Sequence, residues 1–151
     1  MILAIDPGNE KSAYVMMDGK LRPLYSGIAD NGDVLTIIEE TGCTHMAIEM
    51  VASYGMAVGA TVFETVFWIG RFYEQARAND HIVYIEKVYR KDVKMNLCQS
   101  MRAKDSSVRQ ALIDRFGVVG VKKNPGWFYG FKKDIWSAYA VGVTYWDMKE
   151  V

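Results

Sequence analysis

The hydrophobic and polar positions at the start of the chain predict three strands. A short apolar run, residues 2–5, ends at an Asp-Pro-Gly turn that begins with Asp6, as expected of a buried strand. Two further strand-like stretches, residues 12–17 and 21–28, are separated by an Asp-Gly pair that is typical of a two-residue hairpin turn. The chain is therefore expected to open with three hairpin-connected strands.

Helical and strand-like patterns follow one another from residue 30 to the end of the chain. The expected elements are a helix at 30–40, a strand at 45–48, a long apolar helix at 55–79, a strand at 81–85, basic helices at 91–97 and 106–116, a loop at 117–130 and a helix at 132–149. Hairpin-connected strands followed by strands that alternate with helices imply helices packed on a mixed sheet. The sequence predicts an α/β fold with a mixed five-stranded sheet flanked by helices.

The helix expected at 55–79 carries many apolar residues. Nearly one face of it is formed by Val58, Val62, Val66, Ile69 and Tyr73. An aromatic stripe of Trp68, Phe72 and Tyr73 is interpreted as core, with a dimer surface as the alternative.

Length and composition are those of a globular domain. The chain has 151 residues, half of them apolar and 13% aromatic, which suits a single domain over residues 1–151. No apolar run is long enough for a membrane span, and no export signal precedes Asp6. Cys43 and Cys98 lack metal-type spacing and are expected to be reduced thiols. These features predict a cytoplasmic protein with no membrane partner.

The net charge of zero conceals a separation of charge along the chain. Residues 87–133 contain 12 basic and three acidic residues, a net charge of +9, and the remainder carries −9. A basic segment of this kind favours an anionic partner, nucleic acid first. Solvated helix faces that contact no partner are the alternative.

Three acidic residues stand at the ends of predicted elements. Asp6 ends the first strand, Glu49 follows the fourth, and Asp134 opens the last helix. If the first and fourth strands are neighbours, their acids meet at one edge of the sheet, where the last helix can add a third. Such clusters suit Mg²⁺ or Mn²⁺, and pairs of these ions serve in phosphodiester hydrolysis. Taken singly, each acid also fits a purely structural role: a turn former, a solvated strand end and a charge that favours a helix N-terminus.

The motifs around these acids resemble those of the RuvC-type Holliday-junction resolvases, in matching order along nearly the whole chain. LAIDPGNEKSAYV resembles the opening strand and turn of the family, AIEMV its second acidic strand, and KKDIWSAYAVG its closing acidic helix. YRKDVKMNL and AKDSSVRQALIDRFG resemble the basic helical region in which the family keeps lysines near the scissile phosphate. The short chain and loose motifs are more similar to phage-type members than to the bacterial housekeeping enzyme.

The resemblance implies a ribonuclease-H-like fold, a homodimer and paired nicks across a four-way DNA junction. It implies that Asp6, Glu49 and Asp134 bind the divalent ion, Mg²⁺ or alternatively Mn²⁺. Lys94 or Lys104 would neutralise charge that develops on the phosphate. The site of action would be the cytoplasm, that of the host cell if a phage encodes the protein.

Two positions depart from the family pattern. Where the closing helix of the family has a second acid, this chain has Ser137, and Asp105 is the candidate substitute as a metal ligand. Because Asp105 lies near a family lysine position, the role of that lysine would pass to Lys104 or Lys94. The aromatic residue that stacks on a junction base is missing from its usual place, and Tyr54 is the nearest ring. A core position for Tyr54 is the alternative.

The sequence therefore predicts a metal-dependent, structure-specific DNA endonuclease that resolves four-way junctions and acts on other branched DNA. The alternatives are a different ribonuclease-H-like nuclease, a non-catalytic branched-DNA-binding module and, from the DPGN motif, a phosphate loop like that of actin-like ATPases and sugar kinases. The residues expected to contact nucleic acid are Tyr54, Lys87, Arg90, Lys91, Lys94, Arg102, Lys104, Lys122 and Lys123.

Overall fold

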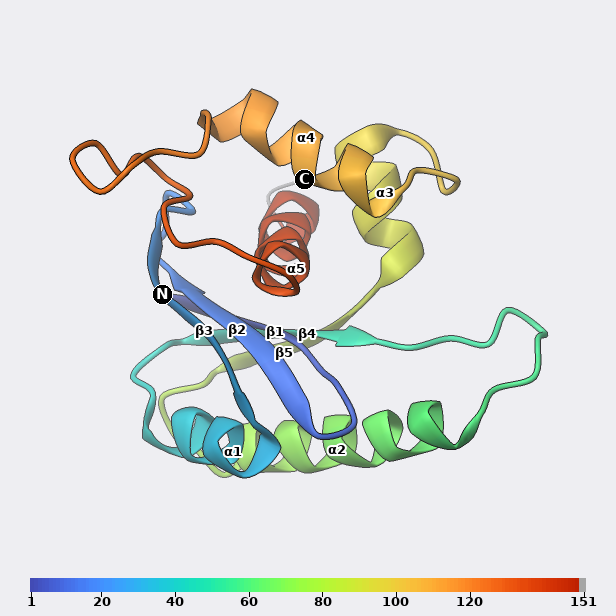
Figure 1. Ribbon diagram of the computed structural model, residues 1–151. Helices are drawn as coiled ribbons and strands as arrows, with labels where there is room; N and C mark the ends of the chain where they lie inside the picture. Colours follow the sequence, from blue (N-terminus) through green and yellow to red (C-terminus); the bar gives the residue numbers. More distant parts are fainter. Residues whose placement is uncertain (150–151) are drawn as a thin grey trace.

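The computed structural model describes residues 1–149, which form a five-stranded sheet with helices on both faces (Figure 1). The strands are β1 (Ile2–Asp6), β2 (Lys11–Met17), β3 (Pro23–Asp30), β4 (His45–Met50) and β5 (Tyr84–Tyr89). The helices are α1 (Asn31–Glu40), α2 (Ala60–Arg77), α3 (Arg90–Cys98), α4 (Asp105–Phe116) and α5 (Ile135–Lys149). The predicted order of the elements is confirmed.

The sheet is mixed, as predicted, because its strands are connected in two ways. The strand order is β3-β2-β1-β4-β5. Hairpin connections make β1–β2 and β2–β3 antiparallel, whereas crossovers through α1 and α2 make β1–β4 and β4–β5 parallel. The first and fourth strands are therefore neighbours in the interior of the sheet.

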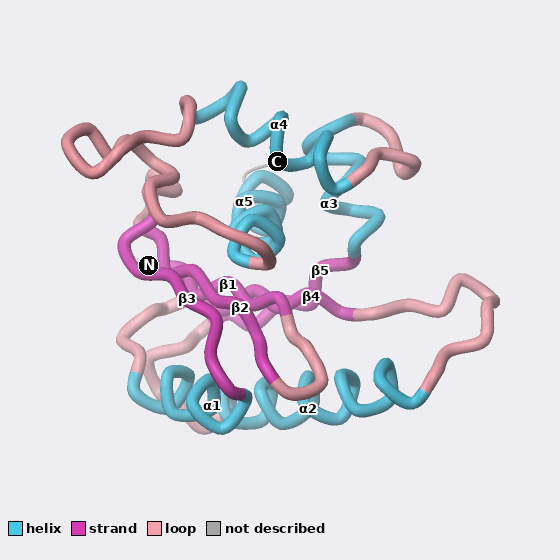
Figure 2. The backbone as a smooth tube through the Cα atoms, in the orientation of Figure 1, coloured by secondary structure: helices cyan, strands magenta, loops and turns pink. Residues whose placement is uncertain are grey.

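Alternate side chains of β1 face two separate hydrophobic clusters. Ile2 and Ala4 belong to the cluster that contains the buried residues of α5, and Leu3 and Ile5 belong to the cluster that contains those of α1 and α2. Figures 1 and 2 show the same layers: α1 and α2 cover one face of the sheet, and α3, α4 and α5 lie over the other. The period of two along a strand thus decides which helices each side chain meets.

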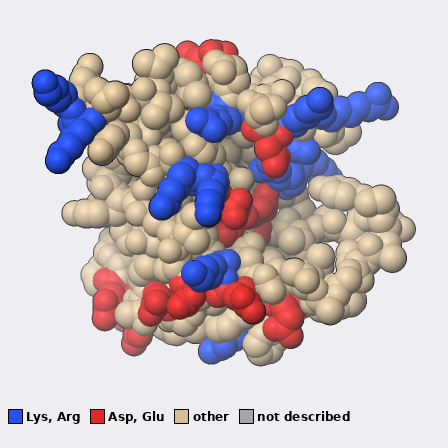
Figure 3. All heavy atoms as spheres, in the orientation of Figure 1, with Lys and Arg blue, Asp and Glu red and all other residues tan. Residues whose placement is uncertain are grey.

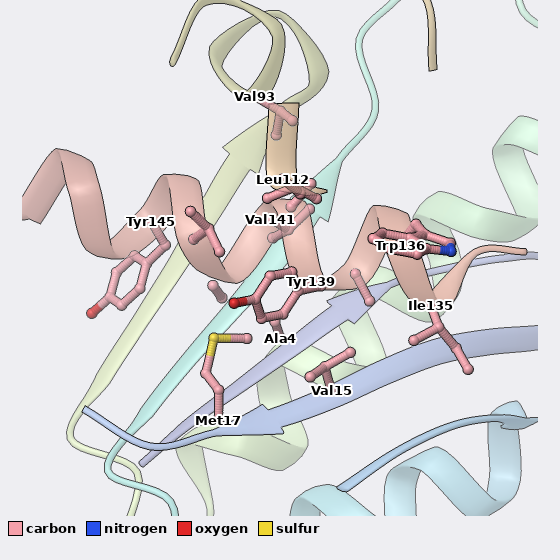
Figure 4. Packing of buried hydrophobic residues seen from close by; sticks show 14 of the residues in the cluster. Ala4, Val15, Met17, Val93, Leu112, Ile135, Trp136, Tyr139, Val141 and Tyr145 are labelled. Carbon is pink, nitrogen blue, oxygen red and sulfur yellow. The ribbon is translucent and has the colours of Figure 1, made fainter. Parts of the chain in front are cut away.

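Helix α5 packs closely against the sheet. At Gly142 a Cβ atom would lie 2.4 Å from a side-chain carbon of Met17 and 2.9 Å from the Cβ of Ala4, so a larger residue would push the helix away. The Tyr139 hydroxyl donates a hydrogen bond of 2.7 Å to the backbone carbonyl of Leu21. Figure 4 shows Tyr139 beside Met17 and Ala4 in this cluster. These contacts fix α5 over the central strands.

Helix α2 begins later than predicted and buries a different face. Residues 51–59, partly assigned to the predicted helix, form a loop that extends away from the sheet (Figure 2). Val66, on the apolar face noted in the sequence, is 37% exposed, and the helix is turned so that Phe72 enters the cluster against α1. Of the aromatic stripe, only Phe72 is fully buried, whereas Trp68 and Tyr73 are partly exposed. The buried residues of α2 are Thr65, Ile69, Phe72 and Ala76.

Strand β5 lies further along the chain than the strand predicted at 81–85. Asn79 accounts for the difference, because its side chain ties the preceding turn to α1. It donates hydrogen bonds to the carbonyls of Ile38 (2.9 Å) and Thr41 (3.0 Å), and its Oδ1 accepts one from the backbone N–H of His81 (2.9 Å). The turn is thereby held outside the sheet, and pairing with β4 starts after it.

Both cysteines are free thiols, as predicted. Cys43 is buried and Cys98 is partly buried. Within residues 1–149, none of the helices combines the length and the apolar character needed to cross a lipid bilayer.

Candidate functional site

Asp6 and Glu49 lie side by side at the carboxyl ends of β1 and β4. The two strands are parallel neighbours, and their last paired residues directly precede these acids. Each acid stands two residues beyond an alanine of the α5 cluster, Ala4 in β1 and Ala47 in β4, so both point to the face covered by α5. The meeting of strand-end acids that the sequence predicts is therefore present for this pair.

The two carboxyl groups interact strongly because they are shielded from water. Burial, then the charge of Glu49 and a hydrogen bond between the two carboxyl groups, raises the pKa of Asp6 to about 9. The charge of Asp134 acts in the same direction, and that of Arg90 opposes it. The Oε1 atom of Glu49 is buried, and among residues 1–149 it accepts no hydrogen bond. This arrangement is unfavourable for two negative charges unless a cation compensates them.

A buried hydrogen-bond network fixes the turn that follows Asp6. The Gly8 N–H donates to Ser12 Oγ (3.1 Å), the Ser12 hydroxyl donates to Asn31 Oδ1 (2.6 Å), and Asn31 Nδ2 donates to the Gly8 carbonyl (2.9 Å). A Cβ atom at Gly8 would lie 2.2 Å from the backbone oxygen of Lys11, so this turn requires glycine. The position of Asp6 thus depends on a side chain from α1 that the sequence analysis did not single out.

Replacing Asn31 by alanine is expected to lower the free energy of unfolding by about 1–3 kcal/mol, because Ser12 and the Gly8 carbonyl lose buried partners. Thermal denaturation measures the effect. Asn9→Ala is the matched control, since Asn9 belongs to the same turn but is exposed. Equal losses in the two variants would show that the network does not stabilise the turn.

Asp134 and Asp105 border a shared open pocket of about 330 Å³ at the start of α5. The Asp134 carbonyl accepts the first hydrogen bond of the helix, from the Ala138 N–H at 2.9 Å. Ser137, the position at which the resolvase pattern has an acid, lines the same pocket. Asp105 therefore faces the same space that an acid at position 137 would face, and its role as a substitute ligand stays a prediction.

Arg90, the first residue of α3, connects the strand-end acids with Asp105. Its Nη1 lies 3.8 Å from Glu49 Oε1, and its Nη2 forms an ion pair and a hydrogen bond with Asp105 Oδ1. The side chains of Arg90 and Glu49 are 26% and 15% exposed, so water screens this pair only in part. The sequence analysis placed Arg90 among the DNA contacts and gave it no role beside the acids.

The residues present fit a hard divalent cation in their chemistry. Carboxylate oxygens are the ligands that Mg²⁺ and Mn²⁺ prefer, and a cation would compensate both the buried Glu49 oxygen and the repulsion between Glu49 and Asp6. Within residues 1–149, no group of three or more His, Cys, Asp or Glu side chains is already close enough to hold an ion. A complete ligand set therefore requires Asp134 or Asp105 to move toward the Asp6–Glu49 pair.

A second pocket, of about 240 Å³, shares Arg90 with the pocket of Asp105 and Asp134 and carries positive charge. Its lining residues are Tyr54, Arg90, Lys91, Lys94 and Met101. Tyr54 belongs to the loop that follows β4 and is 61% exposed, so the alternative of a core tyrosine is wrong. A ring beside three cations suits a nucleotide, with stacking on the base and charge on the phosphate.

The other predicted DNA contacts are spread more widely. Exposed positions are occupied by Lys87, Arg102, Lys104, Lys122 and Lys123. Lys104 directly precedes Asp105 at the start of α4. Lys122 and Lys123 belong to the loop between α4 and α5, on the opposite side of α5 from α3 (Figure 1). In Figure 3, several separate groups of basic side chains lie in the upper half, some of them beside a central acidic group, and most of the acidic side chains gather along the lower part.

Two basic residues, Arg109 and Lys133, line the pocket of Asp105 and Asp134 but were not predicted as site residues. The guanidinium of Arg109 lies 4.8 Å from the centre of the Trp136 ring. Lys133 directly precedes Asp134 and has a left-handed backbone, with φ of 47°. Lys133 could have been predicted from the sequence, because it is next to Asp134 in the chain. Arg109 could not, because only the packing of α4 on α5 brings it to the pocket.

The strand order, the helices on both faces and the acids at the ends of parallel strands define a ribonuclease-H-like fold of the RuvC type. RuvC of Thermus thermophilus aligns at a TM-score of 0.65 and 16% identity, over 99% of this chain and 95% of that chain. The same protein in complex with a Holliday-junction substrate gives 0.71 and 14%, over 99% and 94%. A fowlpox virus resolvase in complex with Holliday-junction DNA gives 0.55 and 12%, over 98% and 99%.

The likeness is one of structure. No protein-family model matches the sequence, and a search of curated proteins finds no match. The structural neighbours cover nearly the whole chain, so the predicted RuvC-type, ribonuclease-H-like fold is confirmed.

Proposed function

We propose that this protein is a structure-specific DNA endonuclease that depends on Mg²⁺ or Mn²⁺ and resolves four-way junctions by paired phosphodiester hydrolysis. The observation that carries the proposal is the pairing of Asp6 and Glu49 at the ends of adjacent parallel strands, with the charge of Asp134 close by. Two structural neighbours, RuvC and the fowlpox resolvase, are complexes with Holliday-junction DNA. The basic segment around this site supports the same class of substrate.

The residues divide into those that hold the ion and those that hold DNA. Asp6, Glu49 and Asp134 would bind the divalent ion, with Asp105 as the further ligand. The bound ion would lower the pKa of a coordinated water and supply hydroxide at neutral pH. Lys94 or Lys104 neutralises charge on the phosphate, since such charge is best stabilised by cations fixed in place.

The remaining contacts position the DNA. Tyr54 stacks on an exposed base at the junction, a contact worth about 1–3 kcal/mol. The cations of β5, of α3 and of the loops contact phosphates and hold the arms. These residues are Lys87, Arg90, Lys91, Arg102, Lys122 and Lys123.

The test is cleavage of a synthetic four-way junction in Mg²⁺, Mn²⁺ or EDTA. A linear duplex, a flap and an RNA–DNA hybrid are tested in parallel as alternative substrates. We expect nicks in opposite strands of the junction only when a divalent ion is present. Glu49→Gln should reduce the rate by about 10²–10⁴-fold, because several kcal/mol of transition-state stabilisation are lost. Glu39→Gln is the matched control, because Glu39 is an exposed residue of α1, on the other face of the sheet. Equal rates for wild type and Glu49→Gln, or cleavage confined to the hybrid or the flap, would overturn the proposal.

A non-catalytic branched-DNA-binding module is the second candidate. It is favoured by Ser137 in place of an acid and by Arg90, which already lies beside Glu49. Such a module would bind the junction tightly and leave it intact in both Mg²⁺ and Mn²⁺. The same assay, read for both binding and cleavage, separates the two candidates.

We further propose that two copies act on one junction, since a four-way junction offers two equivalent strands to cut. The outer face of α2 supports this pairing, because Phe63 and Phe67 are 63% and 62% exposed with Val66 between them. A second copy would cover this apolar face in a two-fold symmetric way.

Phe67→Glu is expected to give a monomer in light scattering, because it places a charge at the centre of the proposed dimer contact. It should also reduce paired nicking to single nicks. Tyr25→Glu is the control, since Tyr25 is equally exposed, at 66%, but lies on β3. A wild-type monomer, or a dimer that survives the change at Phe67, would contradict the α2 interface.

A further inference from the structure

Arg90 lies at the boundary between the acidic and the basic pocket. It lines the pocket of Asp105 and Asp134 and also that of Tyr54 and Lys94. Its guanidinium is near the mainly buried Glu49 and is paired with Asp105, whose side chain is 82% exposed. One end of this bridge is thus shielded and the other is open to solvent.

Resting on the function proposed above, we propose that Arg90 is an internal counter-ion that occupies the carboxyl groups of Glu49 and Asp105 until DNA binds. In the free protein its charge compensates Glu49 and Asp105, the groups that a divalent ion would also bind. A DNA phosphate in the basic pocket offers Arg90 another anionic partner, with bidentate geometry that suits a guanidinium. Arg90 then leaves the carboxylates, which become free for the ion.

This device couples two binding events. Because Arg90 and the ion compete for the same oxygens, metal binds weakly to the free protein. Because the phosphate draws Arg90 away, DNA raises the affinity for metal, and by linkage metal raises the affinity for DNA by the same factor. The ion is then held firmly only when a substrate is present, and Arg90 acts as a positioning residue for that step.

Mn²⁺ titration of the protein, followed by electron paramagnetic resonance with and without a four-way junction, tests the coupling. For wild type we expect the junction to raise Mn²⁺ affinity by about 5- to 150-fold, the usual range of such coupling. Arg90→Gln should bind Mn²⁺ more tightly than wild type without DNA and should gain less when DNA is added. Arg90→Lys, which keeps the charge but not the bidentate geometry, should match wild type in Mn²⁺ affinity without DNA and gain less when DNA is added.

Arg109→Gln is the matched control, because it removes the same charge from the same pocket while Arg109 stacks on Trp136. Its Mn²⁺ affinity should follow wild type. An unchanged or weaker affinity in Arg90→Gln, or an equal gain in Arg109→Gln, would overturn the proposal. If Arg90→Gln does not fold, the absence of coupling in wild type alone is sufficient to reject it.

The outcome is separate from that of the nuclease proposal, since the titration without DNA involves no cleavage. A protein that resolves junctions but shows no gain in Arg90→Gln rejects the counter-ion alone. A protein that shows the gain but never cuts DNA keeps the counter-ion and rejects the nuclease.

Discussion

Asp6→Asn is expected to abolish junction cleavage and, at the same time, to stabilise the metal-free protein. The carboxyl group of Asp6 is buried beside Glu49, and its pKa of about 9 shows how poorly the site accepts a second negative charge. Asparagine has nearly the same shape, carries no charge and can donate a hydrogen bond to Glu49. Near neutral pH the unfolded chain has Asp6 ionised, whereas the metal-free folded protein must hold it protonated, so the change removes the cost of that protonation together with a proposed metal ligand.

The expected loss of cleavage is about 10²–10⁴-fold, because metal-assisted stabilisation of the transition state is worth several kcal/mol. The expected gain in the free energy of unfolding in EDTA is about 1–3 kcal/mol, the usual cost of a buried polar group without full compensation. In a chain of this size that corresponds to about 2–4 °C in Tm per kcal/mol. Wild type should gain stability when Mn²⁺ is added, and Asp6→Asn should gain much less.

Asp33→Asn is the control for this prediction, since Asp33 is exposed in the first turn of α1, on the other face of the sheet. It should leave cleavage unchanged and should not stabilise the protein in EDTA. If Asp6→Asn cleaves like wild type, Asp6 is no ligand; if it destabilises the metal-free protein, the buried charge is compensated without metal.

Local sequence patterns were sufficient for the architecture and for two of the three acids. A strand of period two that ends at an acid places that acid on a known face, and parallel neighbours align their carboxyl ends. Asp6 and Glu49 could therefore be paired before the structure was known, once β1 and β4 were assumed to be adjacent. The last helix was predicted from residue 132 and α5 begins at Ile135, so the place of Asp134 at its start could also be predicted.

Features that depend on packing between distant elements could not be predicted. The rotation of α2 is decided by which residues fit the cluster against α1, so Phe72 is buried and Val66 is exposed. The bridge from Glu49 through Arg90 to Asp105 needs α3 and α4 to pack side by side over the sheet edge. Nothing in the local pattern of α3 distinguishes Arg90 from its neighbour Lys91.

The affinity for a four-way junction in EDTA is expected to fall steeply with salt. The segment of residues 87–133 has a net charge of +9, and most of its cations lie on α3, between α3 and α4, on α4 and in the loop before α5. If these contact six to ten phosphates, affinity should fall by about 10³–10⁵-fold between 50 and 200 mM salt, because condensed counterions are released on binding. Equilibrium binding at several salt concentrations gives the slope.

Removing a single basic residue that contacts phosphate should change the salt dependence of the affinity by a measurable amount. Arg102→Gln removes an exposed cation between α3 and α4 and should lower the slope by about one unit, weakening binding to all DNA alike. Arg77→Gln is the matched control, because Arg77 is exposed at the end of α2, on the other face of the sheet, beside Glu74. A slope near zero, or equal effects of the two changes, would mean that the basic face does not contact phosphates. A steep slope that responds to Arg102 and not to Arg77 would place the DNA on the same face as the carboxylate pair, where cleavage requires it.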